Sequence, residues 1–172
     1  GHARVTLQIS IAANRGRVNW DDLNGERSYD SMAAYRQSKI ALGLFGLELD
    51  RRSAQGGWGI TANLSHPGVA PTNLLAARPE IGRAEPVPAR RAIAALSRLG
   101  ILGTVATARL PALMAATPPG ERGGTFYGPS GVRGRGWRPA GQSLYSSLRS
   151  PEDASRMWDL TQRLTEVSFP VR

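Results

Sequence analysis

The amino-acid sequence predicts an α/β fold in which a small parallel sheet is flanked by helices. Short β-branched segments alternate along the chain with longer segments whose apolar residues recur at helical spacing. The length of 172 residues suits a single domain spanning residues 1–172. A composition that is 41% hydrophobic and 20% charged excludes disorder across the whole chain.

The first part of the chain predicts a strand, a long helix and a second strand. Residues 5–11 are short and β-branched, as expected of a strand. Residues 31–52 carry the strongest helix signal, and either Asp30 or Ser31 can cap its first turn. A second strand is predicted over residues 58–65, where it is stopped by a Pro-Gly pair.

The second part predicts two helices, a third strand and a final helix. The helices cover residues 89–98 and 102–117, and the strand covers residues 124–127. Residues 128–150 are rich in Gly, Pro and Ser and are expected to form a loop. The final helix is predicted over residues 151–166, with proline in its first turn.

The formal net charge of +9 suggests nucleic acid as a binding partner. The basic residues are nevertheless scattered, without a run of five or more, and no motif of stacking aromatic residues accompanies them. We therefore interpret the basic residues as a solvated surface and expect no nucleic-acid partner.

Several other classes of site are excluded by composition. The sequence has no cysteine, which excludes disulfides and thiolate ligands, and its two histidines do not suggest a zinc site. No metal site is expected. No segment has the pattern of a signal peptide or the length of apolar sequence that a membrane span needs, and we expect a cytoplasmic protein.

Tyr35 and Lys39 form the most informative pair in the sequence. They are four residues apart in the predicted helix, so their side chains share one face. An ammonium ion one turn from a phenol favours the phenolate, which suits proton exchange with a carbonyl or an alcohol. Of the 22 Lys and Arg residues only Lys39 is lysine, and a guanidinium would not replace its compact charge in a tight site.

This pattern resembles the short-chain dehydrogenase/reductase family, whose catalytic helix carries Tyr-x-x-x-Lys. Ser10 lies at the end of a predicted strand, where the family has its catalytic serine. Pro67 and Gly68 follow the next strand, and Thr72 lies four residues beyond that glycine, as in the family. The insert around Trp20, and His66 before Pro-Gly, resemble the retinol-dehydrogenase-like branch.

The resemblance implies an NAD(P)-dependent oxidoreductase that moves a hydride between NAD or NADP and a small-molecule carbonyl or alcohol, expected to be apolar. It implies three catalytic residues, which are Ser10, Tyr35 and Lys39. Tyr35 would be the acid/base, Lys39 would favour its phenolate and bind the ribose, and Ser10 would hydrogen-bond the substrate oxygen. The implied cofactor-binding residues are Tyr35, Lys39, Pro67, Gly68, Val69 and Thr72.

The resemblance further implies a Rossmann-like, doubly wound parallel sheet, of which the chain would hold the C-terminal half. No Gly-rich turn of the phosphate-binding kind follows a strand in this sequence. We therefore expect about three strands with flanking helices, and an isolated chain that is inactive or self-associates through an exposed sheet edge. The alternative is a non-catalytic relative that serves as a binding or scaffold protein.

Overall fold

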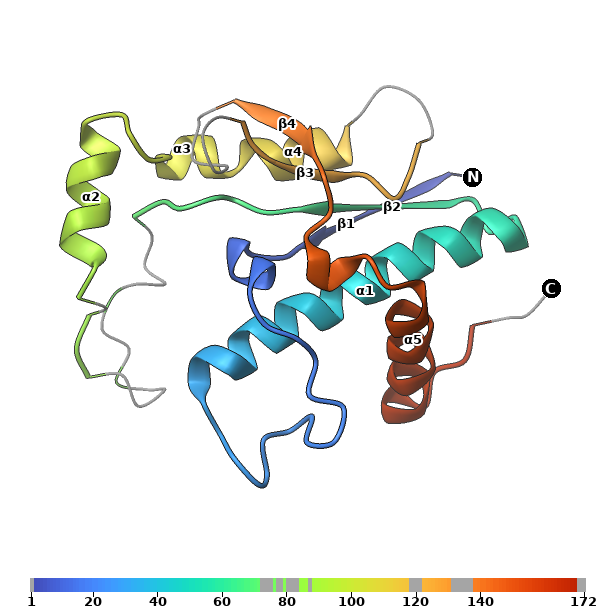
Figure 1. The fold of residues 1–172 in the computed structure, drawn as a ribbon. Helices are drawn as coiled ribbons and strands as arrows, with labels where there is room; N and C mark the ends of the chain where they lie inside the picture. Colours follow the sequence, from blue (N-terminus) through green and yellow to red (C-terminus); the bar gives the residue numbers. More distant parts are fainter. Residues whose placement is uncertain are drawn as a thin grey trace.

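The computed structural model describes residues 2–71, 76, 79, 84–86, 88–117, 122–130 and 138–169. These residues form a four-stranded sheet in the order β1-β2-β3-β4 (Figure 1). The strands β1 (Ala3–Gln8), β2 (Ile60–Ser65) and β3 (Phe126–Pro129) run parallel, and β4 (Pro139–Gln142) runs antiparallel to β3. The mostly parallel sheet confirms the predicted α/β class.

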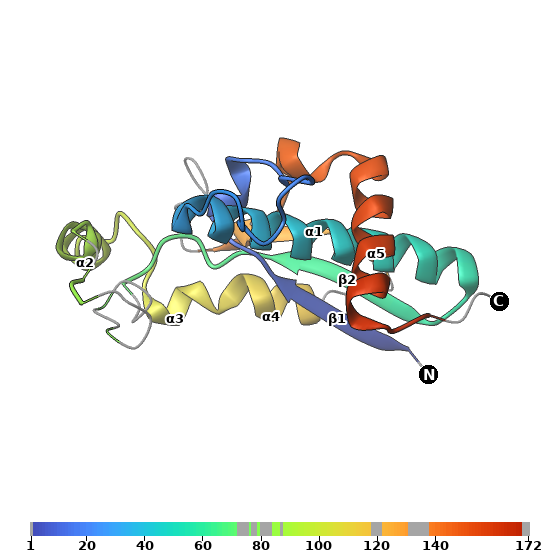
Figure 2. The same cartoon turned by 90° about the horizontal axis from the view of Figure 1, so that it is seen from below.

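Helices cover both faces of this sheet. The long helix α1 (Ser31–Gly56) packs on β2, and α5 (Pro151–Thr165) packs against α1 on the same side. The short helix α4 (Leu110–Ala116) packs on the opposite face, against β1, β2 and β3. Figure 2 shows the sheet between these two layers.

Local sequence sets both ends of α1. The carboxylate of Asp30 accepts a hydrogen bond of 2.6 Å from the amide of Ala33, so Asp30 is the N-cap. Gly57 ends the helix at a φ of +62°, a left-handed conformation that glycine adopts without strain. The helix therefore runs four residues beyond the predicted end at Arg52.

Two glycines let α1 approach the sheet closely. A Cβ atom built on Gly46 would lie 2.7 Å from a methyl carbon of Leu7 and 2.9 Å from one of Leu64. A Cβ atom on Gly43 would lie 2.7 Å from a methyl carbon of Leu148. Because interiors are close-packed, these positions leave no room for a larger side chain.

A buried carboxylate on α1 is held by two arginines of the same helix, one of which reaches α5. Glu48 is 1% exposed and accepts hydrogen bonds from Arg51 at 2.7 Å and from Arg52 at 2.6 Å. Burial opposes its ionisation, but the two guanidinium groups outweigh burial and lower the pKa of Glu48. The guanidinium of Arg52 also lies 5.0 Å from the ring centre of Trp158 on α5. Arg52 also pairs with Asp159 of α5 at 3.5 Å, so this arginine links the two helices beside the apolar core.

The second half of the chain differs from the prediction in three places. Strand β3 covers Phe126–Pro129, whereas the sequence predicts a strand over residues 124–127. Residues 139–142 form β4, although residues 128–150 are predicted to be a loop. The predicted helix over 102–117 is instead two helices, α3 (Val105–Ala108) and α4, which part at Arg109. Pro111 accounts for this break, because it lacks an amide hydrogen and is accommodated in the first turn of a new helix.

The remaining elements are short or lie at the ends of the sheet. Helix α2 (Arg90–Arg98) lies close to its predicted position. The 3₁₀ helices η1 (Ile11–Asn14) and η5 (Ser146–Leu148) follow β1 and β4. The predicted strand over residues 5–11 therefore ends earlier, at Gln8, and Ser10 begins a helical turn.

His66 joins the end of β2 to the hairpin of β3 and β4. Its ring is 1% exposed and lies 5.3 Å from the ring centre of Phe126 and 5.9 Å from that of Tyr145. The amide of Gly68 donates to Nδ1 at 3.1 Å, so Nε2 carries the proton and donates to Gln142 Oε1 at 3.1 Å. Burial lowers the pKa of His66, against a smaller opposite effect of Gln142, and raises that of Tyr145 to about 12.

Gly46→Val tests the close approach of α1 to the sheet. We expect an overpacked interface that lowers the free energy of unfolding by about 3 kcal/mol, measured by chemical denaturation. The control is Gly141→Val in β4, where nothing lies within 4 Å of the new Cβ atom. Equal stability changes for the two variants would contradict the close approach.

The neutral His66 predicts a loss of stability in mild acid. Because burial lowers its pKa in the folded state, the unfolded chain takes up a proton first as the pH falls below about 6.5. We expect the free energy of unfolding to fall between pH 6.5 and 5 with a slope of at most about 1.4 kcal/mol per pH unit. His66→Asn removes the titrating group and should flatten this dependence, and an unchanged pH profile in that variant would exclude His66 as its source.

Candidate active site

Ser10 lies where the chain leaves β1. Its backbone is extended, and it caps η1 by accepting a hydrogen bond of 3.2 Å from the amide of Ala12. The preceding residue, Ile9, donates its amide to the carbonyl of Ser65 at 2.8 Å, which fixes this position at the carboxyl end of the sheet. Within the described part of the chain the Ser10 hydroxyl proton has no acceptor. The hydroxyl is therefore available to donate to a bound oxygen.

Tyr35 and Lys39 lie on the first half of α1, one turn apart. The Lys39 ammonium is 5.8 Å from the centre of the Tyr35 ring, and both side chains are half-buried. Neither polar end has a hydrogen-bond partner among the described residues. The adjacent Ser38 is exposed and donates back to the carbonyl of Tyr35 at 2.8 Å, so its hydroxyl is used within the helix.

One stripe of α1 connects this pair to the sheet. Tyr35, Lys39, Gly43 and Gly46 are spaced by four, four and three residues, which places them on one face of the helix. A Cβ atom on Gly43 would lie 3.6 Å from the side chain of Ile9, the residue before Ser10. Lys39 lies one turn before Gly43 on the same face of α1, and Tyr35 lies one turn before Lys39.

The loop between η1 and α1 is fastened to the same helix by Gln37. The Gln37 side chain accepts from the amide of Asn19 at 2.7 Å and donates to the carbonyl of Leu23 at 2.8 Å. The insert thus lies over the helix that carries Tyr35 and Lys39. Gln37 was not identified from the sequence. The available signal was its position midway between Tyr35 and Lys39, which places its side chain on another side of the helix.

Asp22 orders the tip of this loop, and sequence reasoning missed it too. Its carboxylate accepts hydrogen bonds from three consecutive amides, those of Glu26, Arg27 and Ser28, at 2.8 to 3.2 Å. Slight desolvation opposes ionisation, but these bonds outweigh it and lower the pKa of Asp22. An acidic residue followed by Asn-Gly is typical of such a turn, and this was the available signal.

The segment after β2 reaches the same end of the sheet. Gly68 has a φ of +74°, and its amide is held by the buried ring of His66. The carbonyl of Val69 lies 3.3 Å from the position that a Cβ atom of Gly103 would occupy, so this segment is also packed against the chain before α3. Pro67, Gly68 and Val69 are therefore held in place, whereas Thr72 lies outside the described residues.

These groups suit the nicotinamide and ribose end of a dinucleotide. Parallel strands of an α/β sheet present their ligands at their carboxyl ends, where Ser10 follows β1 and Pro67 follows β2. All three residues are half-buried. In the described part of the chain the Tyr35 phenol and the Lys39 ammonium have no hydrogen-bond partner, and the Ser10 hydroxyl, which accepts from Ala12, has no acceptor for its own proton. Such groups are available to a polar ligand.

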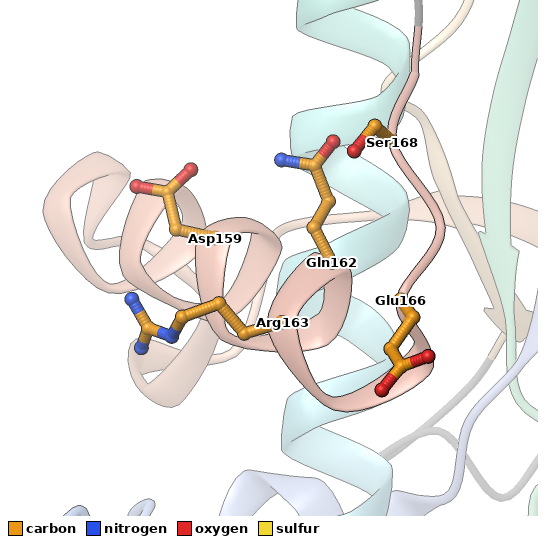
Figure 3. Close-up of a pocket in the computed structure, with 5 residues that line it drawn as sticks. All are labelled: Asp159, Gln162, Arg163, Glu166 and Ser168. Carbon is orange, nitrogen blue, oxygen red and sulfur yellow. The ribbon is translucent and has the colours of Figure 1, made fainter.

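Other sites on the described surface are less suited to this chemistry. Among the described residues no three His, Cys, Asp or Glu side chains could hold a metal ion, and no described helix is long and apolar enough to cross a membrane. Figure 3 shows a polar hollow of about 460 Å³ near the C-terminal end of α5. Its lining residues are Asp159, Gln162, Arg163, Glu166 and Ser168. It is remote from the first half of α1 (Figure 1).

Comparison with solved structures supports the fold. The crystal structure of an uncharacterized protein from Mycobacterium paratuberculosis matches with a TM-score of 0.69 and 28% sequence identity. The match covers 99% of this chain and 53% of that one. The chain thus corresponds to about half of this larger α/β protein.

Comparison with curated proteins gives partial matches to dehydrogenases, and no family model matches the chain. Retinol dehydrogenase 13 from Homo sapiens is 47% identical over 73 residues, which are 42% of this chain and 22% of that protein. Polyprenol dehydrogenase from Mus musculus is 46% identical over 72 residues, again 42% of this chain and 22% of that protein. These similarities confirm the predicted resemblance: over 42% of its length the chain is similar to dehydrogenases that are named for retinol and polyprenol.

Proposed function

We propose that the chain carries the catalytic part of an NAD(P)-dependent oxidoreductase acting on an apolar alcohol or the corresponding carbonyl compound. The observation that supports this proposal is that Tyr35 and Lys39 share one face of α1 with Gly43, which lies against Ile9, the residue before Ser10, whose hydroxyl proton has no acceptor in the described part of the chain. The names of the relatives, which are dehydrogenases of retinol and polyprenol, support both the reaction class and an apolar substrate.

The proposed roles follow from the chemistry of each group. Tyr35 exchanges a proton with the substrate oxygen, and the Lys39 ammonium lies 5.8 Å from the centre of its ring. Ser10 donates its hydroxyl proton to the same oxygen, where negative charge develops. A nicotinamide cofactor would supply the hydride chemistry.

The same residues provide contacts for the cofactor. In the proposal Lys39 also donates to the ribose hydroxyls, and the backbone of Val69 binds the carboxamide beside the turn of Pro67 and Gly68. Thr72 is proposed to contribute to the same contact. Both NAD and NADP are compatible with these residues, because they differ at the adenosine ribose, far from the nicotinamide.

Tyr35→Phe in the full-length protein tests the acid/base role. The variant keeps the ring and loses the hydroxyl, so we expect turnover to fall about 100-fold or more with unchanged thermal stability. The matched control is Tyr29→Phe, since Tyr29 is 70% exposed just before α1 and should retain full activity. Retained activity in the Tyr35 variant would remove this residue from its role.

Lys39→Arg tests whether the compact ammonium is required. A guanidinium keeps the charge but differs in reach and shape, so we expect kcat/KM for the cofactor to fall about tenfold or more. Arg36→Lys, on the same helix, is the control and should leave these constants unchanged. Wild-type steady-state kinetics for Lys39→Arg would contradict the proposed ribose contact.

A further inference from the structure

Helix α2 projects from the body of the protein at the end where β1 and β2 have their carboxyl ends (Figures 1 and 2). Within this helix, Arg90–Arg98, only Ser97 is buried. The Ser97 hydroxyl donates to the carbonyl of Gly103 at 2.8 Å and so fixes the inner side of the helix. The opposite side therefore faces away from the protein.

That outer side carries an apolar group, the α2 patch, made of Leu96, Leu99 and Ile101. Their exposed fractions are 37%, 74% and 56%. Leu96 and Leu99 are three residues apart and share a face of the helix. The amide of Ile101 donates to the carbonyl of Leu96 at 2.9 Å across Gly100, whose φ is +73°, and such a helix end places Ile101 beside Leu96. The three side chains are thus contiguous.

Arginines border this patch. Arg91 and Arg98 are seven residues apart, two turns along one side of α2, and Arg98 directly precedes Leu99. Arg90 and Arg109 are also exposed nearby in the sequence. None of these four guanidinium groups has a hydrogen-bond or ion-pair partner within the described part of the chain.

The positive charge of this region exceeds its negative charge, because Glu85 is the one acidic residue against four arginines in residues 84–117. Residues 88–117 contain those four arginines and no aspartate or glutamate. Contact between two copies of the patch would bring Arg91 and Arg98 of each copy close to the same residues of the other, and like charges oppose such contact. The charge complements an anionic surface instead.

We propose that the α2 patch binds to the surface of an anionic lipid bilayer. Leucine and isoleucine side chains exposed beside arginines are the composition of a helix that lies in the plane of the bilayer interface. The arginine stems can follow the apolar side chains into the interface while the guanidinium groups contact lipid phosphates. This inference does not rest on the proposed enzymatic function.

The position of the patch has a consequence for the proposed active site. Helix α2 and the segments that follow β1 and β2 lie at the same end of the molecule (Figure 1). A protein held to a bilayer through α2 would therefore present that end to the membrane, where an apolar alcohol would be concentrated.

Vesicle flotation tests the proposal with the full chain. We expect the protein to float with vesicles of phosphatidylcholine containing about 30 mol% phosphatidylserine, and much less with phosphatidylcholine alone. Leu99→Asp and Ile101→Asp should each lower partitioning about tenfold or more. The matched control is Leu164→Asp on α5, whose side chain is 72% exposed and should have no effect.

Charge variants distinguish binding through the α2 patch from non-specific attraction between anionic lipid and a chain with a net charge of +9. Arg91→Gln and Arg98→Gln should each lower partitioning about fivefold, whereas Arg163→Gln on α5 should not. The proposal is overturned if the wild-type chain does not float, or if the α5 variants lose binding as much as the α2 variants do. It is equally overturned if Leu99→Asp abolishes a dimer seen by light scattering, because the patch would then bind a second copy.

Discussion

The close contact between α1 and the sheet is the constraint on which the candidate site depends. Gly43 and Gly46 let the helix backbone lie against side chains of Leu7, Ile9 and Leu64, and this contact fixes how far the helix stands from the strands and how it is rotated. Lys39 and Tyr35 continue the same stripe, one and two turns before Gly43. The two glycines therefore determine which way the face of α1 that carries Tyr35 and Lys39 is turned.

A second constraint acts on the other side of the proposed site. His66 is neutral and buried, and its two ring nitrogens join the Gly68 amide to Gln142 in β4. Gln142 in turn donates to the carbonyl of Pro129 at 2.8 Å. The turn that would hold a carboxamide is thus fixed by a strand far away in the sequence, which explains how a segment rich in Pro and Gly can be positioned for binding.

Periodicity, capping residues and turn residues in the sequence predicted the helices and strands whose formation depends on nearby residues. The capped helix α1, strands β2 and β3, and α5 with its first-turn proline all follow from periodicity and turn residues close to them. Strand β4 does not, because its sequence Pro-Ala-Gly-Gln has low strand propensity and its pairing to β3 is a tertiary effect. The partners of His66 were inaccessible for the same reason. Tyr35 and Lys39 were predicted from their helical spacing and the solitary lysine, whereas Ser10 came from a family resemblance. The structure adds the two glycines on the same face of α1.

The most direct test of the account is where a nicotinamide nucleotide contacts the chain. Amide resonances of the isotopically labelled protein would be followed by NMR during titration with NAD or NADP at up to millimolar concentration, since contacts to one end of the cofactor give weak binding. The account predicts shifts of the amides of Ala12, Lys39, Gly68 and Val69, with none at Gln162 or Ser168 beside the hollow on α5. Shifts confined to that hollow, or no shifts at saturating nucleotide, would contradict it.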